Sequence, residues 1–162
     1  MSDLLVRLYD LPVFAAEDKV RASGVVVRRA ISPERHIVLG WIGSHFGDTW
    51  VSEAALGMSQ QPPTVYLAVR GQELLGFACY DTTAKGFFGP TGVDEAARGQ
   101  GIGETLLIVT LRAMREVGYA YGVIGDPGPV EFYTKRLDAL EIPRSKPGHY
   151  SGMLYRAPGS PG

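Results

Sequence analysis

A short glycine-rich turn, Arg98 to Gly103, carries the most distinctive chemistry in this sequence. It reads Arg-Gly-Gln-Gly-Ile-Gly and opens an amphipathic stretch that runs from Gly101 to Val117. The first amides of a helix have no partners inside the helix, and the helix dipole adds positive potential at that end. Glycines also let an anion approach the backbone without meeting a Cβ atom. The turn therefore predicts an anion site for a diphosphate, with contacts from Arg98, Gly99, Gln100, Gly101, Ile102 and Gly103.

Two common nucleotide-binding motifs do not fit this turn. The Rossmann fingerprint needs a glycine where Glu104 or Leu106 stands, and the P-loop needs a Gly-Lys-Ser/Thr that the sequence lacks. The remaining alternative is structural, because a glycine-rich turn before a helix can serve helix–sheet packing alone.

The elements that must hold the turn follow from periodicity and chain breaks. A β-branched run predicts a strand over 25–30, and Ser32-Pro33 begins a helix that reaches Phe46, before a second helix over 49–56. Alternating residues predict an antiparallel meander over 65–70, 74–80 and 87–93, with a bulge at Pro90 because proline cannot donate to a sheet ladder. The helix over 101–117 then crosses to a parallel strand over 119–125. A short helix over 129–137 and a closing strand over 149–156 complete the expected order.

With these elements in place, the sequence resembles the GCN5-related N-acetyltransferase (GNAT) family, whose acetyl-CoA loop reads Gln/Arg-x-x-Gly-x-Gly/Ala before a long helix. Arg98, Gly101 and Gly103 match that loop, and Gly92-Val93-Asp94 precedes it as the family's fourth strand does. The resemblance implies an α/β fold: a mixed, mainly antiparallel sheet whose parallel fourth and fifth strands splay apart, with helices on both faces. It also implies acetyl-CoA as co-substrate, with pantetheine paired to the strand backbone near Gly92 and Val93, and no metal.

The resemblance continues past the loop. Phe132-Tyr133 matches the end of a family pattern that usually begins with Asn, where this chain has Asp126. Pro129 replaces an expected alanine, and no Gly-Phe follows Lys135. By resemblance, Asp126 and Tyr133 lie beside the cofactor, and Tyr133 donates a proton to the departing CoA thiolate. A free thiol has a pKa of about 8.5 and a phenol one of about 10, so a nearby tyrosine can donate a hydrogen bond or a proton as negative charge builds on sulfur. The alternative for Tyr133 is ordinary packing of its ring.

Four residues fall where the family forms its acceptor pocket: Trp50, Glu53, Tyr80 and Asp81. Trp50, Glu53 and Tyr80 are the candidates for substrate contact. An aliphatic amine must lose a proton before it attacks, which makes Glu53 and Asp81 the candidate catalytic bases, unless an ordered water serves instead. Core packing of the aromatic rings and solvation of the acids are the alternative interpretations.

Composition excludes several other classes of function. The net charge of −1 gives no positive field for nucleic acid, and no apolar run is long enough for a membrane span. The histidines lack metal-ligand spacing, and Ser44-His45 lacks a hydrolase elbow. The single cysteine, Cys79, lies in an apolar strand without a neighbouring histidine, so an acyl-cysteine is not expected. One cysteine also fits a reducing, cytoplasmic setting.

The sequence therefore predicts an acetyltransferase that moves an acetyl group from acetyl-CoA to a primary amine in a ternary complex. A non-catalytic acyl-CoA sensor, a longer acyl donor and an oxygen acceptor remain open, as do the identity of the amine, whether a small molecule or a peptide, and homodimer formation. The expected organisation is an N-terminal extension over 1–24, the acyltransferase domain over 25–156 and a flexible tail over 157–162.

Overall fold

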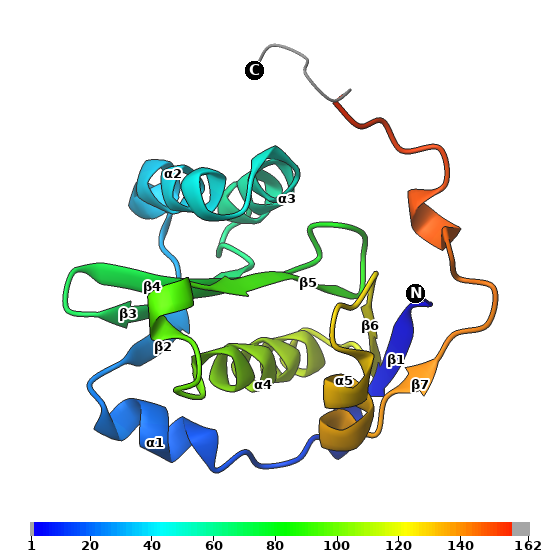
Figure 1. The fold of residues 1–162 in the computed structure, drawn as a ribbon, viewed down its shortest axis with the longest axis horizontal. Coiled ribbons are helices and arrows are strands. Elements are labelled where there is room, and N and C mark those ends of the chain that lie inside the picture. Colours follow the sequence, from blue (N-terminus) through cyan, green and yellow to red (C-terminus); the bar gives the residue numbers. More distant parts are fainter. Residues whose placement is uncertain (1, 157–162) are drawn as a thin grey trace.

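A seven-stranded sheet in the order β2-β3-β4-β5-β6-β1-β7 forms the frame of the protein (Figure 1). The computed structural model describes residues 2–156. Every neighbouring pair of strands is antiparallel except β5 and β6, which are parallel. The strands are β1 (Leu4–Arg7), β2 (Val26–Arg29), β3 (Val65–Arg70), β4 (Glu73–Tyr80), β5 (Phe87–Val93), β6 (Tyr121–Ile124) and β7 (Leu140–Glu141). The expected mixed, mainly antiparallel sheet is confirmed.

Helices cover both faces of this sheet, as expected (Figure 1). One face carries α1 (Ala16–Ala22) and α4 (Ile102–Glu116), and the other carries α2 (Arg35–His45) and α3 (Asp48–Met58). The last helix, α5 (Val130–Leu137), follows β6. Four short 3-10 helices complete the described elements: Leu8–Asp10, Ser32–Glu34, Glu95–Ala97 and Gly148–Tyr150. Because each face is covered, the molecule has two apolar cores, one around Leu106 and Leu111 and one around Ile42 and Phe77.

The parallel pair β5 and β6 separates almost as soon as it forms. Only Phe87 and Phe88 pair with β6, opposite Val123 and Ile124. On its other side, β5 shows a register shift against β4, where Cys79 alone stands opposite Gly89 and Pro90. The extra residue lies in β5, so the predicted bulge at Pro90 is confirmed. Beyond the bulge, the edge of β5 that would have continued along β6 is free of a strand partner among the described residues.

The N-terminal residues belong to the same sheet. Although the sequence analysis assigns residues 1–24 to an extension, β1 lies between β6 and β7, and Leu4, Val6 and Leu8 are fully buried. Their alternation is the period of a half-buried strand. α1 is joined to α4 by a two-pronged ion pair in which Arg112 donates to Glu17 at 2.6 and 2.8 Å. The expected tail over 157–162 lies outside the described residues.

The closing strand predicted over 149–156 is wrong. A 3-10 helix, Gly148–Tyr150, begins this stretch, and the residues after it form neither helix nor strand. Gly152 has a φ of 74°, in the left-handed region that regular extended strands do not use. The outer edge of β1 is instead paired with the two-residue strand β7.

Candidate functional site

The start of α4 forms one wall of a cavity of about 680 Å³. Gly101 caps the helix with a left-handed φ of 85°, which turns the chain from the glycine-rich loop into the helix. The cavity lies between this helix start, the free edge of β5 and α5. Of the residues expected to contact a diphosphate or pantetheine, seven line it: Gly92, Val93, Arg98, Gly99, Gly101, Ile102 and Gly103. We call this space the loop cavity.

The glycines of the loop cavity have different structural roles. A Cβ atom on Gly103 would meet nothing closer than Val93 Cγ2 at 3.7 Å, and one on Gly99 would have no neighbour within 4 Å. A Cβ atom on Gly101 would lie 2.9 Å from the Cβ of Ala16 in α1. Gly101 is therefore required for packing and for its positive φ, whereas Gly103 leaves open space at the first turn of the helix.

Arg98 and Gln100 are held differently. The Arg98 side chain donates from Nε to the carbonyl of Val93 at 3.2 Å, so the arginine is attached to the end of β5 and borders the cavity. Gln100 does not line the cavity, and its side-chain oxygen accepts a hydrogen bond from Arg70 at 3.3 Å. The structure thus brings every residue of the turn except Gln100 to the cavity wall.

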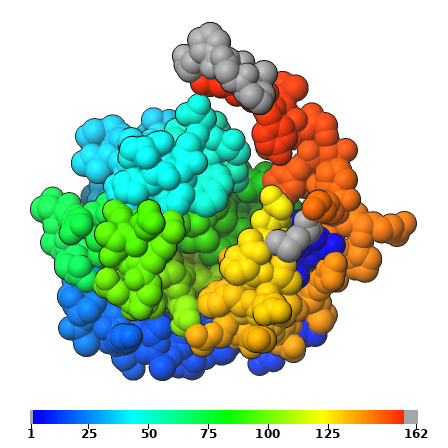
Figure 2. All heavy atoms as spheres, in the orientation of Figure 1, coloured from blue at the N-terminus to red at the C-terminus, as the bar shows by residue number. Residues whose placement is uncertain are grey.

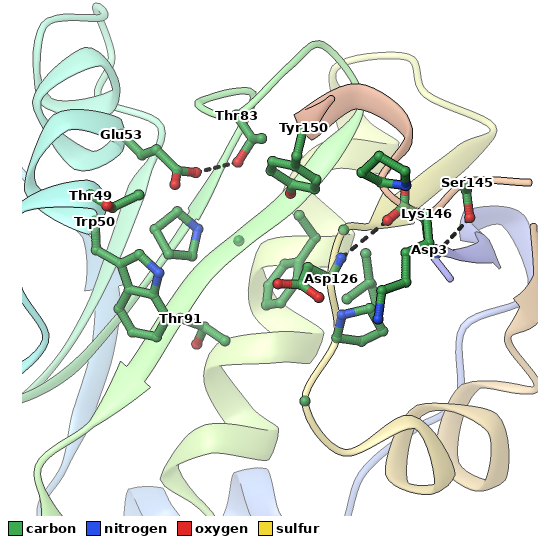
Figure 3. Close-up of a pocket in the computed structure, with 18 of the residues that line it drawn as sticks. Asp3, Thr49, Trp50, Glu53, Thr83, Thr91, Asp126, Ser145, Lys146 and Tyr150 are labelled. Atoms are coloured by element: carbon green, nitrogen blue, oxygen red, sulfur yellow. Dashed lines mark hydrogen bonds between the residues drawn. The ribbon is translucent and has the colours of Figure 1, made fainter. Parts of the chain in front are cut away.

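A second cavity of about 660 Å³ also has Tyr133 in its wall. Figure 3 shows this cavity in close-up. We call it the acidic cavity, because Asp3, Glu53 and Asp126 line it, together with a single cation, Lys146. Figure 2 shows the surface hollowed between α3, the segment after β6 and the C-terminal segment, which are the parts that supply its walls. Glu53 comes from α3 and accepts a hydrogen bond from the Thr83 hydroxyl.

The two cavities meet at four residues: Trp50, Thr91, Pro129 and Tyr133 line both. Tyr133 is 8% exposed, and burial raises the pKa of its phenol above the ordinary value. Its hydroxyl makes no hydrogen bond to any other described residue. Tyr133 is therefore protonated at neutral pH and can donate a hydrogen bond. It lies where a ligand in one cavity would contact a ligand in the other.

Two of the expected acceptor residues do not reach either cavity. Tyr80 is 3% exposed, and its hydroxyl accepts a hydrogen bond from Arg29 at 3.0 Å. Asp81 turns the chain after β4 with a φ of 60°, and its carboxylate accepts a hydrogen bond from the Gly86 amide at 2.7 Å. Tyr80 therefore fills the core, and Asp81 stabilises the turn after β4. Asp126, which was expected beside the cofactor, lines the acidic cavity and not the loop cavity.

Cys79 is fully buried and lines neither cavity. Burial, with a smaller contribution from the charge of Glu53, raises the pKa of its thiol, which leaves little thiolate at neutral pH. This environment agrees with the expectation that no acyl-cysteine forms. Among residues 2–156, no group of three or more His, Cys, Asp or Glu side chains is arranged to hold a metal ion.

Several residues of the site were not singled out from the sequence. Phe46 lines the loop cavity, while Asp3, Lys146 and Tyr150 line the acidic cavity. The alternation of Leu4, Val6 and Leu8 is a signal that would have placed Asp3 at the start of a buried strand. The C-terminal contributors gave no comparable signal, because the chain around them has no periodicity.

Comparison with known proteins identifies the family. The sequence profile described as the Acetyltransferase (GNAT) family matches residues 17–137. The chain belongs to this family. The match includes α4 with its glycine-rich turn and ends at the last residue of α5. A search of curated proteins finds no significant match.

Solved structures share the family fold at low sequence identity. One is a GCN5-related glucosamine N-acetyltransferase region in a fungal multi-domain β-N-acetylglucosaminidase, with a TM-score of 0.72, 14% identity, and coverage of 87% of this chain and 19% of that one. GCN5-related N-acetyltransferases from Sphaerobacter thermophilus and Kribbella flavida give TM-scores of 0.64 and 0.59, at 18% and 21% identity. They cover 87% and 86% of this chain, which spans 48% and 53% of their own lengths. These GNAT structures establish the fold and leave the acceptor open.

None of the helices described between residues 2 and 156 has the length and apolar character required to cross a membrane.

Proposed function

We propose that this GNAT protein transfers an acetyl group from acetyl-CoA to a primary amine by direct attack in a ternary complex. The observation that carries the proposal is the junction of the two cavities at Trp50, Thr91, Pro129 and Tyr133. A helix start suited to a diphosphate lies on one side of this junction, and carboxylates suited to an amine lie on the other. A donor and an acceptor bound in the two cavities would meet at Tyr133.

The loop cavity fits the cofactor on the chemistry of its walls. The amides of Ile102, Gly103 and Glu104 open α4, and no described residue accepts a hydrogen bond from them. Gly103 leaves room for a diphosphate, and Arg98 adds a positive charge beside it. The free edge of β5 at Gly92 and Val93 offers backbone groups to the amides of a pantetheine arm. Bound there, acetyl-CoA would supply the thioester whose carbonyl carbon the amine attacks.

Tyr133 is the proposed proton donor to sulfur. As the new carbon–nitrogen bond forms and the carbon–sulfur bond breaks, negative charge builds on sulfur and requires a proton. Burial keeps the Tyr133 phenol protonated at neutral pH, and its hydroxyl has no competing partner among the described residues. The backbone near Val93 would polarise the carbonyl that is attacked.

Glu53 is the proposed base for the amine proton. It lines the acidic cavity, and its carboxylate is oriented by the Thr83 hydroxyl. Asp81 is left out of this role because its carboxylate is directed to the Gly86 amide and borders neither cavity. A water molecule held by Glu53 would serve the same purpose if the amine does not reach the carboxylate directly.

The test combines binding with turnover. Titration calorimetry should show binding of CoA and acetyl-CoA at micromolar concentrations, and a thiol-reactive dye should record CoA release when amines are added. Tight binding with no release for any amine would support a sensor and overturn the catalytic proposal. CoA release with alcohols and not with amines would support an oxygen acceptor. CoA release only with longer acyl-CoA donors would support transfer of a longer acyl group.

A further inference from the structure

The acidic cavity has an excess of negative charge that no residue between 2 and 156 neutralises. Asp3, Glu53 and Asp126 face it, against Lys146 alone. None of the ion pairs formed within residues 2–156 includes any of these four side chains. Figure 3 shows Glu53 on one side of the cavity and Asp3 on the other, with Tyr150 and Asp126 between them. The carboxylates therefore surround the space and are not directed away from it.

Asp3 is the most buried of the three acids, at 6% exposure. Its Oδ1 atom accepts a hydrogen bond from the Asp126 amide at 3.1 Å. Its Oδ2 atom has no hydrogen-bond donor or cation among the described residues, and the side chain lines the cavity. This oxygen is not cut off from solvent, so it is available to pair with a cation that enters the cavity.

The pKa of Tyr150 reflects the negative potential inside the cavity. Burial, followed by the charges of Glu53, Asp3 and Asp126, raises the pKa of its phenol to about 12. The aromatic rings of Trp50, Phe88, Tyr133 and Tyr150 line the same space. Aromatic faces attract ammonium groups, and the attraction strengthens where water is excluded. Carboxylates and aromatic rings together match a ligand that carries positive charge on a short aliphatic frame.

We propose that the acceptor is a small diamine or polyamine, with one nitrogen acylated and a second kept as an ammonium group. This inference rests on the proposed function. The reacting nitrogen would lie at the junction near Trp50 and Tyr133, lose its proton to Glu53 or to a water on it, and bond to the acetyl carbon as the carbon–sulfur bond breaks. The second nitrogen would stay protonated beside Asp3 and Asp126, which line the acidic cavity and not the loop cavity.

A monoamine would leave the carboxylates of the acidic cavity without a positive partner during the reaction. The nitrogen that attacks must be neutral, so a monoamine would bring no lasting positive charge to the three carboxylates. Lys146 supplies one ammonium group to the cavity wall, which leaves two negative charges in excess among the lining residues. A ligand with a second, protonated nitrogen offsets part of that excess. It should therefore bind in preference to a monoamine of the same length.

The walls favour a small molecule over a protein chain. Tyr150, Met153 and Tyr155 of the C-terminal segment form part of the lining. Arg156 then pairs with Asp48 at the start of α3 at 3.4 Å, which ties this segment across the cavity to the opposite wall. The remaining space, about 660 Å³, accommodates an extended aliphatic diamine, whereas a folded protein surface would need the C-terminal segment to move.

The experiment compares matched pairs of amines in the intact protein. Putrescine and n-butylamine have the same carbon chain and differ by one amino group, and cadaverine and n-pentylamine form a second pair. With acetyl-CoA, kcat/KM for each diamine should exceed that of its monoamine by about tenfold or more, and the ratio should shrink as salt is raised. Equal kcat/KM within both pairs would overturn the proposal, as would preferential acetylation of a lysine-rich peptide.

Two isosteric variants locate the second ammonium. Asp3→Asn keeps the acceptor for the Asp126 amide, and Asp126→Asn keeps a residue that tolerates the φ of 44° found there. Each should reduce the diamine-to-monoamine ratio by about tenfold. Asp10→Asn, at an exposed aspartate that lines neither cavity, is the control and should leave the ratio unchanged. A ratio unchanged in both cavity variants would overturn the assignment.

Failure of the diamine inference and failure of catalysis give different results. Calorimetry with putrescine and n-butylamine, in the presence of CoA, reports recognition without turnover. Binding of putrescine alone, with neither amine acetylated, would support the diamine site and overturn the transferase. Acetylation of both amines at equal efficiency would support the transferase and overturn the diamine site.

Discussion

Gly92 of β5 lies against the aromatic ring of Phe46, the residue that follows the last residue of α2. A Cβ atom at position 92 would overlap three carbons of that ring. Phe46 also packs on Trp50, with ring centroids 4.8 Å apart, and on Phe77 at 6.0 Å. Because Gly92 has no side chain, the ring of Phe46 can pack directly on β5. This contact holds the strand that borders the loop cavity against the helices α2 and α3.

Gly92→Ala should destabilise the protein and disturb the cavity together. The added methyl forces Phe46 away from a packed aromatic group, and overpacking of this kind costs about 1–3 kcal/mol. Urea unfolding should record that loss, with weaker CoA binding measured by calorimetry. Gly103→Ala is the matched control, because its Cβ would have only an ordinary contact with Val93 at 3.7 Å. Equal unfolding midpoints for the two variants would contradict this account of Gly92.

Gly103 and Gly101 should respond differently to a bulky side chain. Gly103→Val places its branch in open space at the first turn of α4, so we expect CoA affinity to fall by about tenfold or more while the unfolding midpoint changes little. Gly101→Val combines a positive φ of 85° with a contact to Ala16, and it should lower stability by more than about 1 kcal/mol. Calorimetry and urea unfolding on both variants separate the two roles.

An unchanged CoA affinity in folded Gly103→Val would show that the diphosphate does not approach this turn. The glycines of the loop would then serve packing alone, and the anion site would have to lie elsewhere along α4.

Tyr133→Phe separates proton donation from packing. The ring remains, but the hydroxyl at the junction of the two cavities is lost, so turnover with the best amine should fall by roughly 10²-fold while CoA affinity stays the same. Steady-state kinetics beside calorimetry measures both quantities. Turnover equal to that of the parent protein would leave Tyr133 as a packing residue and assign the proton transfer to another group or to water.

Glu34 should contribute to stability only above mildly acidic pH. Its carboxylate accepts hydrogen bonds from Arg28 at 2.6 and 2.9 Å, and this pairing, opposed in part by burial, lowers the pKa of Glu34 in the folded protein. A lowered folded pKa means that the stabilisation is present above the unfolded value of about 4.3 and disappears as pH falls through the folded pKa.

Glu34→Gln should therefore cost stability at pH 7 and much less near pH 3. Urea unfolding of both forms at the two pH values measures the difference. A loss of the same size at both pH values would mean that the charge of Glu34 is not responsible for its contribution to stability.

Local sequence patterns were sufficient to predict the elements whose periodicity or special residues lie within the element itself. The amphipathic period from 101 to 117 predicted α4 to within one residue at each end, and Pro90 predicted the bulge in β5. The glycine-rich turn was also predicted from the sequence, because the start of a helix is set by neighbours a few positions away, whereas Tyr133 was singled out by its match to the family pattern. By contrast, the predicted strand over 149–156 rested on a weak pattern that Gly152, with a φ of 74°, interrupts.

Only the tertiary structure decided what the acidic cavity contains. The Asp126 amide binds the Asp3 carboxylate across 123 positions of sequence, and the Asp3 amide binds the Ser145 hydroxyl across 142. No period or motif links such residues, since sheet order brings β1 between β6 and β7. The same order left Tyr80 and Asp81 outside both cavities, although they stand near family pocket positions in the sequence. The sequence determined the helix start that is suited to an anion because that geometry is local, whereas the charge of the acidic cavity arises from chain segments that meet only after folding.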